Sequence, residues 1–104
     1  MRVTIDLDSA EMLPVLSAYY NLKQLTDDVE VYRTRRGYHV IGYGLPISAK
    51  DALTIREHLG DDSNRIYLDE VAAKGGNAKP QQILWTHKYG RASRHKIQIP
   101  SNLY

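Results

Sequence analysis

The chain has 104 residues, of which 42% are hydrophobic and 25% are charged, and it contains no cysteine. This length allows one domain with one modest core. Without cysteine a disulfide framework and a thiolate zinc site are excluded, which suits a reducing compartment. No apolar run approaches the roughly 18 residues of a membrane span, and Asp6 falls where a signal peptide has its apolar stretch. We therefore expect a cytoplasmic protein with no membrane partner.

Charge is distributed unevenly along the chain, although the formal net charge is only +2. Residues 1–70 hold 8 Lys or Arg against 12 Asp or Glu, whereas residues 71–104 hold 6 Lys or Arg and no acid. A basic segment that follows an acidic core is typical of proteins with a polyanionic partner. A solvated basic tail has the same composition, so charge alone leaves both interpretations open.

The N-terminal segment predicts a strand followed by a helix. Val3, Ile5 and Leu7 alternate with polar residues, which is the period of a half-buried strand. Apolar residues recur at helical spacing over residues 12–25, and Ser9 is a candidate N-cap for this helix.

Two more strands and a second helix are predicted in the middle of the chain. Residues 29–34 and 38–43 have strand composition, and the short link over 35–37 predicts a hairpin between them. The second helix is expected to begin after Ser48 as N-cap and to end at Gly60.

A fourth strand is predicted over residues 65–69, where Ile66 and Leu68 alternate with polar residues. The order of elements is then strand, helix, strand, strand, helix, strand. This βαββαβ order is that of ferredoxin-like and RRM-like folds, in which two helices cover one face of an antiparallel sheet. We therefore predict an α+β fold of this kind.

The whole chain, residues 1–104, is expected to form a single domain. Residues 1–73 make up the βαββαβ core, residues 74–80 a loop, and residues 81–104 an irregular basic C-terminal extension. Within the extension, residues 82–85 are a candidate for an extra edge strand.

Strand alternation predicts an acidic cluster on the open face of the sheet. If the apolar residues of the first and fourth strands face the helices, Asp6, Asp8 and Asp69 point away from them. If Val40 is buried, His39 lies beside these carboxylates. Three neighbouring carboxylates repel one another unless a proton or cation intervenes, and oxygen ligands favour Mg²⁺ or Mn²⁺. Ordinary solvated aspartates are the alternative, and the residues alone leave both open.

Three motifs in this region resemble those of the archaeo-eukaryotic primase superfamily, the primase and primase-polymerase enzymes. That family has an RRM-like core with a D-x-D motif, then S-G-x-x-G-x-H, and then a hydrophobic residue followed by Asp. The counterparts here are Asp6-Leu7-Asp8, Arg35-Arg36-Gly37-Tyr38-His39-Val40 and Leu68-Asp69. The resemblance spans about residues 3–70.

The resemblance implies catalysis and metal ligation by Asp6, Asp8 and Asp69, which would hold two divalent ions. It also implies that His39, with Arg36 or Arg35, contacts the phosphates of a nucleoside triphosphate.

The sequence departs from the family in two respects. Arg33 and Thr34 stand where the family has Ser and Gly, and the chain is shorter than most primases and lacks a cysteine-based zinc module. Three alternatives stay open for so short a chain: a minimal enzyme, one part of a multi-subunit enzyme in which a protein partner supplies the missing subdomains, or an inactive relative that kept the fold.

Basic residues in the extension are candidates for nucleic-acid binding. They are interleaved with aromatic residues and have no acid nearby, a mixture that suits base stacking and phosphate neutralisation. The candidates are Lys88, Arg91, Arg94 and Lys96. The sequence does not decide whether Arg56 and Arg65 reach the acidic site or pair with nearby acids.

Three hypotheses follow. The first is a minimal primase-polymerase-like domain that performs metal-dependent nucleotidyl transfer on a DNA or RNA template. The second is a non-catalytic, RRM-like nucleic-acid-binding domain with vestigial acids. The third is a replication-accessory subunit that binds protein at a sheet edge.

Overall fold

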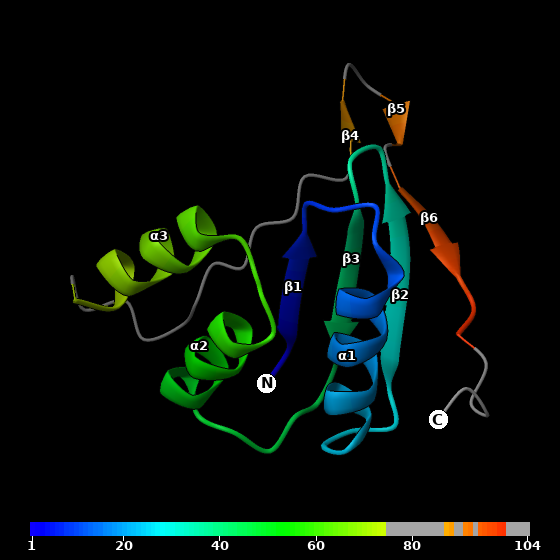
Figure 1. Ribbon diagram of the computed structural model, residues 1–104. Helices are drawn as coiled ribbons and strands as arrows, with labels where there is room; N and C mark the ends of the chain where they lie inside the picture. The colour runs from blue at the N-terminus through cyan, green and yellow to red at the C-terminus, as the bar shows by residue number, and fades with distance from the viewer. Residues whose placement is uncertain (75–86, 89–90, 93, 100–104) are drawn as a thin grey trace.

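The computed structural model describes residues 1–74, 87–88, 91–92 and 94–99 (Figure 1). The elements are β1 (Val3–Leu7), α1 (Met12–Lys23), β2 (Val29–Thr34), β3 (Tyr38–Gly42), α2 (Ala49–His58), α3 (Ser63–Lys74), β4 (His87–Lys88), β5 (Arg91–Ala92) and β6 (Arg94–Ile97). The predicted α+β class with an antiparallel sheet is confirmed.

Four strands form the main sheet in the order β1-β3-β2-β6, and every neighbouring pair is antiparallel. The first three strands have the neighbours that a βαββαβ fold requires. Strand β6 adds to the outer side of β2, so part of the extension that was expected to be irregular is paired to the sheet. The short strands β4 and β5 form a separate two-stranded ribbon.

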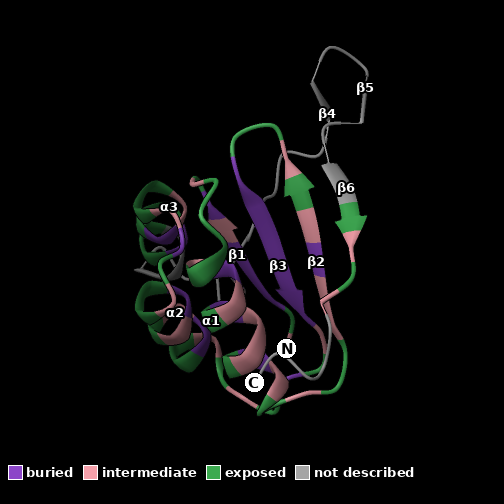
Figure 2. Cartoon of the chain, turned by 45° about the vertical axis from the view of Figure 1, so that its right-hand side comes forward, coloured by how far each residue is buried: buried purple, intermediate pink, exposed green. Residues whose placement is uncertain are grey.

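The core lies between the sheet and its helices (Figure 2). Strand pairing aligns Ile5, Val40 and Val31 in one row across β1, β3 and β2, and all three side chains are buried. Helix α1 packs on this row through Val15, Ala18 and Leu22, and α2 contributes Ala52. The period-2 pattern of β1 therefore predicts its buried face correctly.

Local capping signals are confirmed for α2 but not for α1. Ser48 Oγ accepts the Asp51 N–H at 3.2 Å, and Gly60 has a φ of 87°, which favours glycine at a helix end. Helix α1 instead begins after Glu11, which makes no side-chain cap. Ser9 accepts the Glu11 N–H just before the helix, so its prediction as N-cap is wrong.

The predicted fourth strand is a helix, and this is the main correction to the expected element order. An Asp62 oxygen accepts the N–H groups of Asn64 and Arg65, at 2.8 and 3.2 Å, and so caps α3. Ile66 is buried in this helix, whereas Leu68 is 65% exposed, so the two do not share a face. The five residues 65–69 are too few to distinguish the period of a strand from that of a helix. The N-cap at Asp62 favours the helix.

Most of the predicted loop over 74–80 and the whole candidate edge strand over 82–85 lie outside the described residues. In the part of the chain that is described, no helix is long and apolar enough to cross a membrane.

Candidate functional site

The predicted contact between the first acidic motif and the hairpin histidine is present. Asp6 and His39 are opposite one another in the β1–β3 pair, and His39 Nε2 lies 3.6 Å from Asp6 Oδ1. Both side chains are on the face opposite the core row because Ile5 and Val40 occupy that row. The His39 side chain is buried, whereas that of Asp6 is 31% exposed. Strand alternation predicted this pair once β3 was placed next to β1 and Val40 was taken as buried.

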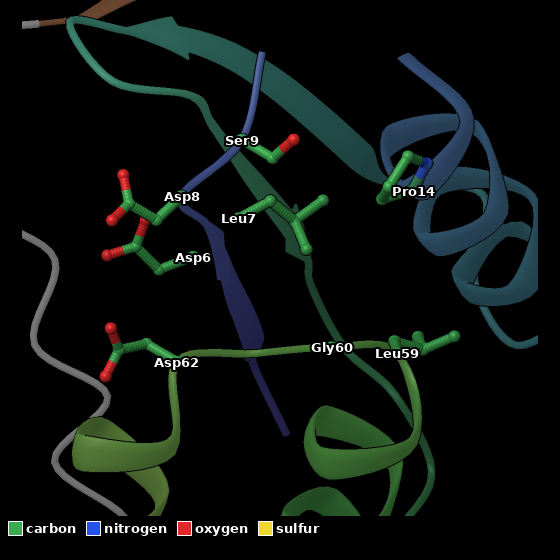
Figure 3. Close-up of a pocket in the computed structure, with 8 residues that line it drawn as sticks. All are labelled: Asp6, Leu7, Asp8, Ser9, Pro14, Leu59, Gly60 and Asp62. Carbon is green, nitrogen blue, oxygen red and sulfur yellow. The ribbon is translucent and has the colours of Figure 1, made fainter. Parts of the chain in front are cut away.

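A pocket of about 380 Å³ borders the end of β1 (Figure 3). Leu7, Pro14 and Leu59 provide much of its apolar lining. The carboxylates of Asp6, Asp8 and Asp62 project to one side of β1, and Asp62 comes from the connection between α2 and α3. The end of β1 therefore combines an apolar recess with a local excess of negative charge.

Burial and negative neighbours raise the pKa of Asp6. Desolvation of its carboxyl group is the largest cause, and the charges of Asp61, Asp62 and Asp8 act in the same direction, whereas Arg65 opposes them. The ionised form of Asp6 is therefore held at an electrostatic cost, which a proton or a bound cation would relieve.

Because the pKa of Asp6 is raised, we expect Asp6→Asn to stabilise the protein at neutral pH. The folded state binds the Asp6 proton more tightly than the unfolded chain does, so ionised Asp6 lowers stability above its folded-state pKa. We expect a gain of about 1 kcal/mol or less at pH 7, because solvent screens this partly exposed side chain. The gain should shrink as the pH falls through the raised pKa and vanish below the ordinary value of 3.8.

Urea unfolding of both proteins between pH 7 and pH 3 measures this difference. The exposed Asp27→Asn is the control and should show no such dependence. A loss of stability in Asp6→Asn at pH 7 would contradict the prediction.

Asp69 lies in a different environment from that expected of a metal ligand. It is buried on α3, and its Oδ2 is 2.6 Å from Nη1 of the fully buried Arg56. It is not among the residues that line the pocket. Within the described residues, no group of three or more His, Cys, Asp or Glu is arranged to hold a metal ion. Asp6 and Asp8 thus both line the pocket, whereas Asp69 forms an ion pair with Arg56.

The centre of the buried ion-pair network is Asp61, which is not among the site residues predicted from the sequence. Its Oδ2 accepts from Arg56 Nε at 2.8 Å, and its Oδ1 pairs with Arg65 and accepts the Asp6 N–H at 2.8 Å. Arg65 and Arg56, which the sequence left undecided, therefore both pair with acids. The four-residue spacing from Asp61 to Arg65 was the sequence signal for part of this network.

The β2–β3 hairpin meets the end of β1 at Gly37. A Cβ atom at this position would lie 1.9 Å from the Leu7 carbonyl oxygen and 2.8 Å from the Ser9 nitrogen. Thr34, which stands where the primase family has Gly, closes the turn because its Oγ1 accepts the Gly37 N–H at 3.0 Å. The exposed Arg35 and Arg36 directly precede Gly37 in the hairpin turn, whose backbone lies against the end of β1 at Gly37.

Only one of the predicted nucleic-acid-binding side chains lies within the described part of the structure. Lys96 on β6 pairs with Glu30 of β2, with 2.7 Å between Nζ and Oε2. The side chains of Lys88, Arg91 and Arg94 lie outside the described residues.

Comparisons of this chain with protein-family models, curated proteins and solved structures found no match. The resemblance to primases therefore rests on the sequence motifs alone.

Proposed function

We propose that this domain binds a nucleoside triphosphate together with Mg²⁺ or Mn²⁺ at the end of β1, as a primase-like nucleotidyltransferase acting on DNA or RNA. The observation that carries the proposal is the contact of His39 with Asp6, at 3.6 Å, beside a pocket that Asp6 and Asp8 both line. This contact joins the first and second motifs of the resemblance in one place.

Asp6 and Asp8 would hold one divalent cation, rather than the two that the resemblance implies. Asp6 and Asp8 supply the carboxylate oxygens that Mg²⁺ and Mn²⁺ prefer, and repulsion among the acids at this end of β1 favours a cation there. Asp69, the third ligand that the resemblance implies, is bonded to Arg56. A bound cation would neutralise charge on the phosphates during transfer.

The remaining predicted residues have roles that follow from their charge. Arg35 and Arg36 supply guanidinium groups for phosphate oxygens, and His39 lies beside the cation ligand Asp6. Lys88, Arg91, Arg94 and Lys96 would hold template or primer through its phosphates. A partner protein would supply the missing subdomains, and a cytoplasmic location belongs to the same proposal.

One observation favours a second candidate, a non-catalytic nucleic-acid-binding domain. The ion pair of Asp69 with Arg56 removes one of the three carboxylates that the primase resemblance requires. In this case the domain binds DNA or RNA without a cation.

Calorimetry with Mn²⁺, alone and with ATP or dATP, tests the proposal on the wild type and on Asp6→Asn/Asp8→Asn. We expect metal-dependent nucleotide binding that the double variant weakens by at least about tenfold, as loss of cation ligands does. The matched control is Asp27→Asn/Asp28→Asn, which removes the same charge from an exposed turn and should leave binding unchanged. Absence of binding below millimolar concentration in the wild type would reject the proposal. Metal-independent binding of single-stranded DNA or RNA would then support the second candidate.

A further inference from the structure

One carboxylate oxygen connects the two backbone segments that border the acidic pocket. Asp61 Oδ1 accepts the N–H of Asp6 at 2.8 Å and the N–H of Asp62 at 2.9 Å. Asp6 and Asp62 lie on β1 and on the α2–α3 connection, and both line the pocket. The position of Asp61 therefore determines how these two segments are placed relative to each other.

Arg65 makes a second connection to β1, two residues before Asp6. Its Nη2 donates to Thr4 Oγ1 at 2.6 Å, and its Nη1 is 3.4 Å from the Thr4 carbonyl oxygen. The same guanidinium group pairs with Asp61. Arg56 fixes the other Asp61 oxygen from the interior, at 2.8 Å. Arg65 therefore binds β1 at Thr4, and Asp61 binds it at Asp6. Asp61 and Arg65 also pair with each other, and Arg56 pairs with Asp61.

We propose that Arg65 and Asp61 are positioning residues for the cation-binding end of β1, so that Arg65, although positively charged, favours the binding of a cation at Asp6. This inference rests on the proposed function. Two effects of Arg65 oppose each other: its charge repels a nearby cation, while its bonds to Thr4 and Asp61 order the ligand. Loss of groups that orient metal ligands typically weakens metal affinity by about 10- to 100-fold, and we expect ordering to outweigh repulsion.

The variant Arg65→Met separates the two effects because they predict opposite signs. If charge dominates, Mn²⁺ binds more tightly to the variant; if positioning dominates, Mn²⁺ binds at least about tenfold more weakly. Calorimetry measures the affinity. Amide hydrogen exchange measures the bond to Asp61, and the Asp6 amide should exchange faster in the variant while the Val40 amide in β3 stays protected. Lys50→Met removes the same charge from an exposed position on α2 and should leave both readouts unchanged.

A second variant keeps the test decisive if Arg65→Met does not fold. Thr4→Val removes the hydroxyl that accepts from Arg65 and leaves every charge in place. It should also weaken Mn²⁺ binding, and unchanged affinity in the folded Thr4→Val protein would overturn the inference.

The remaining outcomes distinguish this inference from the proposed function. If the wild type binds no Mn²⁺, both fail. If the wild type binds Mn²⁺ and folded Arg65→Met binds it equally well or better, the positioning role is wrong and the proposed function stands.

Discussion

Replacing Arg56 with methionine should lower the free energy of unfolding by about 3–5 kcal/mol, the usual cost of removing one partner from a buried ion pair. The Arg56 side chain is fully buried, and its guanidinium group lies 2.8 Å from Asp61 and 2.6 Å from Asp69. The variant leaves both carboxylates in the interior with less compensating charge. Urea unfolding at pH 7, followed by circular dichroism, measures the loss.

A double variant tests whether the loss arises from the ion pair. Replacing Asp69 as well, in Arg56→Met/Asp69→Met, removes one of the stranded carboxylates. We expect it to recover at least about 1 kcal/mol relative to the single variant, because the two residues are directly coupled. Lys50→Met, an exposed change on the same helix, should cost within about 0.5 kcal/mol. A loss below about 1 kcal/mol in Arg56→Met would show that the network contributes little.

Gly37→Ala should have the second largest effect, a loss of about 3 kcal/mol, at the upper end of the cost of over-packing. The added Cβ would lie 1.9 Å from the carbonyl oxygen of Leu7. Because the contact is with backbone, either the hairpin or the end of β1 must move. The same movement shifts His39 relative to Asp6, its partner across the β1–β3 pair. Nucleotide binding, if present in the wild type, should therefore weaken together with stability.

Gly44→Ala is the matched control for this substitution. Gly44 has a φ of 68°, and no atom lies within 4 Å of an added Cβ. Its replacement therefore carries only backbone strain, about 1–2 kcal/mol, and should leave nucleotide binding unchanged. Equal effects of the two substitutions on nucleotide binding would show that the hairpin contact is not needed for the site.

The sequence predicted the structure best where a run of alternating apolar and polar residues was long enough to identify a strand and its buried face. In β1 the alternation of Val3, Ile5 and Leu7 defined the buried face, and the same argument through Val40 placed His39 beside Asp6. Residues 65–69 did not define one period. Ile66 and Leu68 are two positions apart and fit one face of a strand, whereas Ile66 and Asp69 are three positions apart and fit one face of a helix. The side chain of Asp62 caps the helix, and the prediction of a strand over residues 65–69 did not take this cap into account.

The buried ion pairs were harder to predict because they depend on contacts between elements. Arg56 follows Ala52 by four residues on α2, so the two share one face of the helix, and both are buried. Burial of an arginine requires partners, and these come from outside α2. Asp61 and Asp69 are tolerated in the interior because cationic partners meet them there: Arg56 pairs with both, and Arg65 also pairs with Asp61. The pairing of β6 with β2 is similarly non-local, since it joins residues about 60 positions apart.

The bonds from Asp61 and Arg65 to β1 also influence how two copies of this protein can meet. A strand at the end of a sheet presents backbone groups that can pair with a strand of another molecule, a common origin of aggregation. In the described sheet β1 is such an end strand, yet its Asp6 N–H and Thr4 carbonyl are already bonded to side chains of the same chain. These two groups are therefore less available to pair with a strand of a neighbouring molecule, and Asp61 and Arg65 cover part of the exposed edge of the sheet.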